Sequence, residues 1–244
     1  MKFRVSSDRR DVFSRWYALI RPISLVALLL TGALTLQAQE ILTADSFLAQ
    51  VGDRYGVIKD YQAKIVIRSA NAEMKGTIIH KTPKLLRIDF TQPEEQVIAF
   101  NGDVLTVYLP EYRAVLSQSV AIDSEASAAS LASAQGLSML RRNYASAFVS
   151  GPDPVPLEEG SPELVVKLSL TRRSLSEGFR EIKLSVIPST QLIRRIEGRT
   201  IADEFVLFDF TDIKLDQGIP EARFAYDSPA SANLYNNFLF KDTD

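Results

Sequence analysis

Few residues in this sequence could carry out catalysis. His80 is the only histidine, and the chain contains no cysteine. A lone imidazole with neither a second histidine nor a cysteine does not support a metal site or a serine–histidine relay. The absence of cysteine also excludes disulfides, a thiolate nucleophile and a lipid attached to an N-terminal cysteine. We therefore interpret His80 as an ordinary residue on one face of a strand.

Carboxylate pairs are the second place to look for chemistry, and the chain has three: Glu94 with Glu95, Asp203 with Glu204, and Asp209 with Asp212. The first pair lies in a predicted turn, and adjacent residues of a strand point to opposite faces. The same interpretation, solvated side chains, applies to the other two. Asn101-Gly102 is a hairpin signal and not a phosphate-binding loop. We expect a protein that is not an enzyme, with no cofactor and no metal site.

The first 38 residues differ from the rest of the chain. Six basic and two acidic residues precede a 14-residue apolar run, Ile23–Leu36, which is followed by Ala38. These are the parts of a secretory signal, and the run is shorter than the roughly 20 apolar residues of a membrane-spanning helix. We expect a signal peptide at 1–38 that is cleaved near Ala38. An uncleaved N-terminal anchor is the alternative.

Residues 39–244 are then expected to form one exported domain. They contain 22 basic and 28 acidic residues, a net charge of −6. Nucleic-acid binding depends on clustered lysines and arginines, so this balance argues against a nucleic-acid partner. Without disulfides, the stability of the domain must come from its core, and a chain of this length can bury a sizeable one.

The elements that would position any site begin with a helix over 41–58. Phe47, Leu48, Val51 and Tyr55 recur there at spacings of three and four, and Thr43 is a candidate N-cap. From Tyr61 the apolar period changes to two, which is typical of strands. The predicted strands are 61–68, 74–80, 84–90, 96–100, 104–109 and 113–120. Short polar turns between them indicate an antiparallel meander.

The strand pattern breaks at 124–150, which is rich in alanine and serine. This stretch predicts two short helices joined near Gly136, followed by an irregular linker at 151–160, where prolines fix φ and remove donors. Strand periodicity then returns at 163–171, 179–187, 191–200 and 204–214, with 223–226 as a candidate to close the sheet. The sequence therefore predicts an α+β domain of about ten or eleven strands with three helical pieces.

The helices at 124–150 are too short to be stable alone in water. They must pack on something apolar, and the opening helix with one sheet face is the available partner. Two uses of this arrangement remain open. The helices could be a permanent part of an ordinary core, or they could form a lid over a cavity for a lipid or acyl chain. Small alanine and serine side chains leave room that slightly favours the cavity.

Four consecutive segments resemble the LolA family, the outer-membrane lipoprotein carrier proteins of bacterial periplasms. The matching segments are Tyr61–Ile67, Lys75–Phe90, Thr91–Gln96 and Phe100–Pro110. The resemblance implies an unclosed antiparallel β-barrel of about eleven strands covered by a lid of three short helices. It also implies a periplasmic carrier, expected to be a monomer. Such a carrier takes lipoprotein acyl chains from an inner-membrane ABC transporter and delivers them to an outer-membrane receptor or to the membrane.

The resemblance and the helix pattern together suggest which residues bind acyl chains. The family's counterparts of Leu86, Ile88 and Phe90 face the cavity, and amphipathicity adds Leu131, Leu137, Leu140 and Phe148 from the lid. Carriers of the well-studied type latch the lid with an arginine directly before the proline matched by Pro83. Here that position is Thr82, so Lys81 and Lys84 are the latch candidates, although an ammonium lacks the planar fork of arginine.

Two other functions fit the same elements. A periplasmic sensor or regulator with this half-barrel would bind lipoproteins and signal through a membrane partner. A structural or surface protein would fill the interior with its own side chains.

Overall fold

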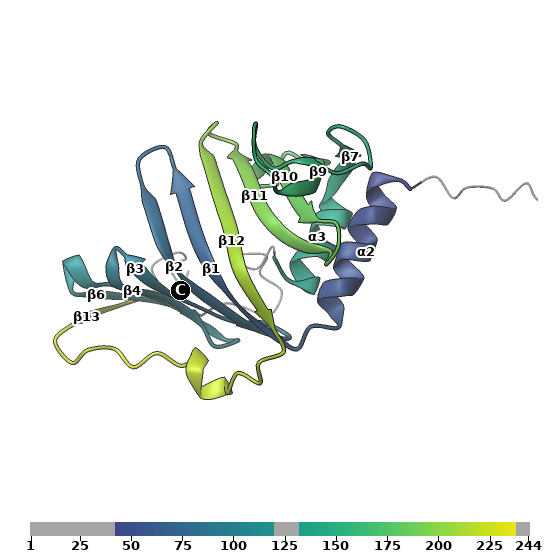
Figure 1. Ribbon diagram of the computed structural model, residues 1–244. Coiled ribbons are helices and arrows are strands. Elements are labelled where there is room, and N and C mark those ends of the chain that lie inside the picture. Colours follow the sequence, from purple (N-terminus) through teal and green to yellow (C-terminus); the bar gives the residue numbers. More distant parts are fainter. Residues whose placement is uncertain (1–41, 120–131, 238–244) are drawn as a thin grey trace, which may run out of the picture. The chain divides into compact units, whose positions relative to one another are not determined.

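One large sheet organises the computed structural model, which describes residues 42–119 and 132–237 (Figure 1). These residues belong to a compact unit, Leu42–Asp244, whereas the predicted signal peptide lies outside the described residues. The described part contains thirteen strands, where about eleven were expected. Within it, no helix is long and apolar enough to cross a membrane.

The strands fall into two groups that meet at β1. The first group is β1 (Asp60–Ser69), β2 (Glu73–Lys81), β3 (Leu85–Gln92), β4 (Glu94–Phe100), β5 (Val104–Leu109) and β6 (Ala114–Ser119). The second is β7 (Tyr144–Phe148), β8 (Val155–Pro156), β9 (Leu164–Arg172), β10 (Phe179–Ile187), β11 (Leu192–Thr200) and β12 (Phe205–Leu215). The last strand, β13 (Asn233–Asn236), pairs with β6 at the edge of the first group. The first group confirms the predicted antiparallel meander.

The order of the strands across the sheet is β13-β6-β5-β4-β3-β2-β1-β12-β11-β10-β9-β7, and β8 pairs with β9. The neighbours are antiparallel except for β13, which runs parallel to β6. The edge strands β13 and β7 do not pair with each other, so the sheet is unclosed. This is an α+β half-barrel of the kind that the LolA resemblance implied.

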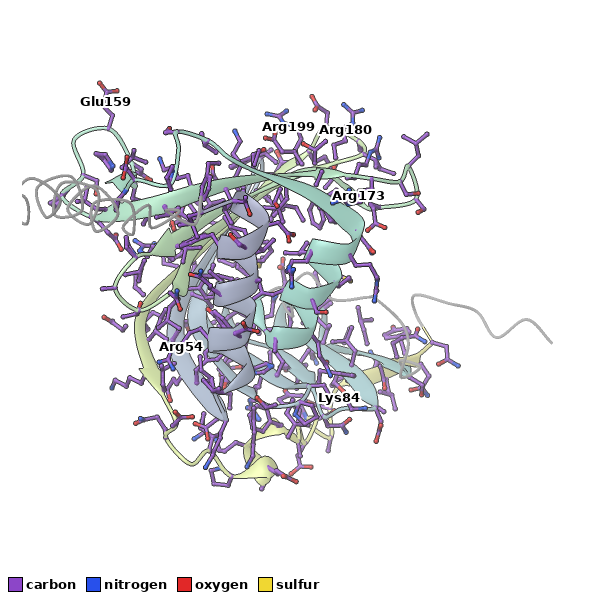
Figure 2. All side chains as sticks on the ribbon, turned by 90° about the vertical axis from the view of Figure 1, so that its right-hand side faces the viewer. Arg54, Lys84, Glu159, Arg173, Arg180 and Arg199 are labelled. Atoms are coloured by element: carbon purple, nitrogen blue, oxygen red, sulfur yellow. The ribbon has the colours of Figure 1, made fainter. Side chains whose placement is uncertain are left out.

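Two α-helices, α2 (Ala44–Gly56) and α3 (Ala134–Asn143), lie side by side in front of the sheet (Figure 2). Thr43 begins α2 as a capping box: its Oγ1 accepts a hydrogen bond from Ser46 N, and Ser46 Oγ accepts one from Thr43 N. Ser133 caps α3 by accepting from Gly136 N. The opening helix and its N-cap are thus confirmed.

The face of the sheet toward the helices, here called the inner face, carries the main core. On β1 it presents Ala63, Ile65 and Ile67, and the intervening Lys64 and Val66 point to the outer face. A 3-10 turn, η3 (Glu221–Phe224), and the rest of the C-terminal segment cover part of the outer face, where Phe224 packs with Ile79.

Three local predictions are wrong. Residues 144–148 form strand β7, paired with β9, and not the end of a second helix. Gly136 lies inside the first turn of α3, so it does not join two helices. The last strand of the sheet is β13, at an edge of the unclosed sheet, whereas 223–226 spans the end of η3 and an extended stretch. Of the expected three-helix lid, two α-helices are described, and the part of 124–150 before residue 132 lies outside the described residues.

Candidate functional site

The inner face and the helices enclose one apolar cluster that contains most of the predicted acyl-binding residues. Those fully within it are Leu86, Ile88 and Phe90 on β3 and Leu137 and Leu140 on α3. Phe148 on β7 packs against the same cluster, with its ring centroid 6.0 Å from that of Phe47. Leu131 lies outside the described residues. The structure therefore brings these side chains together, and their contact with a ligand stays a prediction.

Other members of this cluster were not singled out from the sequence. They are Phe47, Leu48, Val51 and Tyr55 on α2, Leu168 and Leu170 on β9, Leu184 on β10, and Ile193 and Ile196 on β11. The spacing in 41–58 predicted that α2 has an apolar face, and the packing of α2 against α3 agrees with the partner expected for the 124–150 helices. The second group of strands joins β1 through β12, a pairing of residues more than a hundred positions apart, which no local pattern indicates.

The interior is nearly full. Beneath the helices lies a small apolar cavity of about 10 Å³, lined by Tyr55, Tyr61, Ala63, Ala132, Leu192, Ile193, Phe210, Ile213 and Leu215. Sites for drug-sized ligands measure roughly 300–1,000 Å³. A long acyl chain therefore requires the helices to move away from the sheet.

Two buried tyrosines provide hydrogen bonds inside this apolar region. Tyr61 Oη donates to Ala132 O at 3.1 Å, just before the N-cap of α3, and Tyr55 Oη accepts from Ile193 N at 3.1 Å. Burial raises the pKa of Tyr55 to about 12 and the pKa of Tyr61 well above its usual value. Both phenols are therefore neutral, and they tie the helical layer to the sheet at two points.

His80 lies on the inner face as well, next to Tyr61 on the neighbouring strand. The two rings are stacked with centroids 5.2 Å apart. Burial lowers the pKa of His80 to about 4, so its imidazole is neutral near neutral pH. This placement confirms the interpretation of His80 as a residue on a strand face.

The two latch candidates contact other parts of the molecule. Lys81 Nζ donates to Ile219 O at 2.9 Å, and Lys84 Nζ lies 3.5 Å from Asp103 in the β4–β5 hairpin. Thr82 Oγ1 donates to Ile58 O at 2.7 Å. The latch role of the lysines stays a prediction, and the polar contact that reaches the start of α3 comes from Tyr61.

The inner apolar face continues across β4, β5 and β6 with half-buried side chains. Ile98 pairs with Val107, Phe100 with Leu105, and Val107 with Leu116. Because Ile98 also pairs with Ile88, these side chains share the inner face with the core. We call Ile98, Phe100, Leu105, Val107 and Leu116 the β4–β6 apolar face. It extends the core toward solvent without a break in apolar character.

On the outer face, Asp209 is the centre of an ion-pair cluster. Its carboxylate lies 2.9 Å from Arg68, 2.9 Å from Arg194 and 2.6 Å from Arg195. Arg194 also pairs with Glu163, and Arg195 with Glu158 in the proline-rich segment. Each charged group of the cluster has a partner of opposite charge, so the ion pairs connect β1, β11, β12 and the 151–163 segment. Asp209 therefore has a structural role.

An unclosed, mostly antiparallel sheet with two helices on its apolar inner face defines the half-barrel class. A family model described as "Outer membrane lipoprotein carrier protein LolA" matches residues 67–227, and the chain belongs to this family. A search of curated proteins finds no match.

One solved structure shares the fold, and two others are more distant. An uncharacterized conserved protein from Thermus thermophilus has a TM-score of 0.51 at 15% identity, covering 77% of this chain and 98% of that one. A LolA superfamily protein from Nitrosomonas europaea gives 0.40 at 16% identity, with 76% and 98% covered. The lipoprotein LppX of Mycobacterium tuberculosis gives 0.47 at 8% identity, with 72% and 97% covered. The first likeness shows a shared fold, and we draw nothing from the two lower scores.

Proposed function

We propose that this protein is a periplasmic carrier that binds the acyl chains of lipoproteins between its helices and the inner face of its sheet. The observation that carries the proposal is the match to the lipoprotein-carrier family over residues 67–227. Family membership supports binding of lipid or lipoprotein in general. The donor would be an inner-membrane ABC transporter, and the acceptor an outer-membrane receptor or the membrane. The protein acts without catalysis and as a monomer.

Entry of a chain would proceed by exchange of one apolar partner for another. Ile78, Ile88 and Leu168 now lie in one buried cluster with the apolar faces of the helices, and a ligand would replace contacts within this cluster as the helices move outward. Burial contributes about 0.8 kcal/mol per CH₂, so two or three chains supply ample driving force. A ligand shifts a two-state equilibrium only by its differential affinity for the states. The closed state must therefore be stable enough to expel the cargo at the acceptor.

The β4–β6 apolar face supplies the sharpest test, because its side chains are half-buried. An aspartate at Ile88 or Leu140 would unfold the protein, since both side chains are fully buried. Val107→Asp places a charge on the inner face, and Thr106→Asp places one on the outer face of the same strand at similar exposure. Both variants introduce an aspartate at neighbouring positions of β5, and they differ in the face of the sheet that receives the charge.

Native mass spectrometry with lipid extraction is the measurement, on protein purified from the periplasm of an expressing bacterium. We expect a bound acylated species in the wild type and in T106D, and its loss in V107D with an unchanged melting temperature. A wild type that is empty and takes up no fluorescent acyl probe would overturn the proposal. Bound lipoprotein that is never passed to acceptor membranes would indicate the sensor function.

A further inference from the structure

Two turns lie side by side at one end of the sheet and carry exposed aliphatic side chains. The β9–β10 turn contains Leu175, which is 83% exposed, and the β11–β12 turn contains Ile201, which is 56% exposed. Ile201 N donates to Gly178 O at 3.2 Å, and Arg180 Nη2 donates to Ile201 O at 2.9 Å. These bonds hold the two turns together. We call Leu175 and Ile201 the apolar tips.

Arginines surround the apolar tips. Four of them lie at strand ends: Arg172 at the end of β9, Arg173 directly after it, Arg180 on β10 and Arg199 on β11. The last turn of α3, which ends nearby, adds Arg141 and Arg142. Figure 2 shows Arg173, Arg180 and Arg199 gathered at this end, away from Arg54 and Lys84. We call the six the arginine rim. Arg173 N donates to Asn143 O, and Arg173 Nε to Tyr144 O, which joins the end of α3 to this rim.

Acidic residues at this end are fewer, and part of their charge is already paired. Asp203 is shared between Arg180 at 3.6 Å and Arg199 at 3.1 Å, and Asp45 pairs with Arg141 at 3.1 Å. Glu177 and Glu204 are the remaining carboxylates of the two turns. Glu181 of β10 lies opposite Arg199 at the same end, so six arginines face five carboxylates here, whereas residues 39–244 have a net charge of −6. This end is therefore slightly positive, although the rest of residues 39–244 is acidic.

The apolar interior reaches the same end. Phe179 begins β10 directly after the first turn, packs against the core cluster and covers Gly198, while Tyr144 Oη donates to Phe179 O at 3.3 Å. Met74 and Val206 also pack against the cluster from this end. The tips and the rim therefore border the end of the proposed binding region.

We propose that this end of the molecule is a docking surface for an anionic lipid membrane. The apolar tips would enter the interface between headgroups and acyl chains, and the arginine rim would bind lipid phosphates. Two isolated, highly exposed aliphatic side chains suit a deformable bilayer better than a folded partner. The inference rests on the proposed function for its purpose, since a carrier must meet a membrane where cargo is exchanged.

Tryptophan fluorescence provides a direct test, because Trp16 is the only tryptophan in the chain. In a Trp16→Phe background, Leu175→Trp reports on the tips. Leu234→Trp is the matched control, since Leu234 is 60% exposed but lies on β13 at the far edge of the sheet. Vesicles of phosphatidylcholine, with and without phosphatidylglycerol, are the probe. Both variants share one N-terminus, so any binding by that segment cancels in the comparison.

We expect a blue shift for Leu175→Trp with the phosphatidylglycerol vesicles, quenching by brominated lipid, and no shift for Leu234→Trp. The shift should be lost in about 1 M NaCl, where the Debye length is roughly 3 Å. Leu175→Ser with Ile201→Ser should weaken vesicle binding by at least about tenfold. Arg172→Gln with Arg180→Gln should weaken it by about tenfold, and Arg54→Gln should not.

Uptake of a fluorescent acyl probe, measured on the same proteins, separates this inference from the proposed function. If the probe is bound but Leu175→Trp shows no shift, or only the shift of Leu234→Trp, the docking surface is refuted and the carrier function stands. If Leu175→Trp inserts but the wild type takes up no probe, the docking surface stands and the carrier function fails. Melting curves of every variant exclude unfolding as the cause.

Discussion

The two faces of the sheet are covered in different ways. On the outer face, the segment 216–237, here called the outer strap, is held by directed polar contacts. Asp60 is only 3% exposed, and its carboxylate accepts hydrogen bonds from the backbone N–H groups of Gln217, Gly218 and Ile219 at 2.7–3.2 Å. On the inner face, α2 and α3 contact the sheet mainly through apolar side chains.

The outer strap continues to make such contacts along its length. Arg87 donates to Arg223 O at 3.2 Å and to Ala225 O at 2.9 Å, and its guanidinium lies 5.7 Å from the centroid of the Tyr226 ring. The strap ends in β13, hydrogen-bonded to β6. Directed bonds specify one arrangement, whereas apolar contact is non-directional and can be replaced by any apolar partner. The outer cover is therefore the more firmly fastened of the two, and the proposed function requires only the inner cover to move.

The largest expected effect comes from Asp60→Ala, which removes the carboxylate that holds the start of the outer strap. Three backbone N–H groups lose a charged acceptor, so we expect the free energy of unfolding to fall by about 3–5 kcal/mol. Urea unfolding measures this, and hydrogen exchange should show faster exchange across 216–237. Asp227→Ala, an exposed aspartate of the same strap, is the control and should cost less than about 0.5 kcal/mol. Equal losses in the two variants would mean that the strap is not fastened at Asp60.

A smaller effect, on the inner side, is expected from His80 as the pH falls. Its pKa is about 4 in the folded protein against 6.5 in the unfolded chain, because burial disfavours the imidazolium. The unfolded state binds the extra proton between these values, so stability is full above pH 6.5 and is lost as the pH falls toward 4. The loss approaches about 3 kcal/mol.

His80→Phe keeps an aromatic ring beside Tyr61 and removes the titration. Chemical denaturation of both proteins from about pH 7 to about pH 4 should show the wild type losing stability faster than the variant. Parallel curves for the two proteins would contradict the assignment. Hydrogen exchange at 216–237 should not differ between the wild type and His80→Phe near pH 5, because the outer strap contains no histidine.

Local signals in the sequence were enough to predict much of the first half of the chain. The hairpin at Asn101-Gly102 shows why: Asn101 Oδ1 accepts from the N–H groups of Asp103 and Val104, and Gly102 adopts φ of 103°. These preferences belong to the residues themselves. The capping box at Thr43 is local in the same sense.

Long-range pairing explains what local signals missed. Tyr144–Phe148 contains alanine and serine, which do not favour strands, and it becomes β7 because β9 offers hydrogen-bond partners twenty or more residues later. β13 pairs with β6 across more than a hundred residues. For the site, alternation placed Leu86, Ile88 and Phe90 on one face, but no pattern indicated that β9–β11 fill the space opposite them.

The smallest effect, and the most specific to the inner cover, is expected from Tyr61→Phe. The variant loses the hydrogen bond from Tyr61 Oη to Ala132 O and keeps the ring stacked on His80. We expect the free energy of unfolding to fall by only about 1 kcal/mol. Hydrogen exchange should nevertheless rise at 132–143 and stay unchanged at 216–237, and uptake of an acyl probe should become faster. Tyr112→Phe, at a tyrosine that is 68% exposed, is the matched control. Because the outer strap is fastened independently, equal acceleration of exchange on both faces would show that the two covers open as one unit, and the distinction between them would be lost.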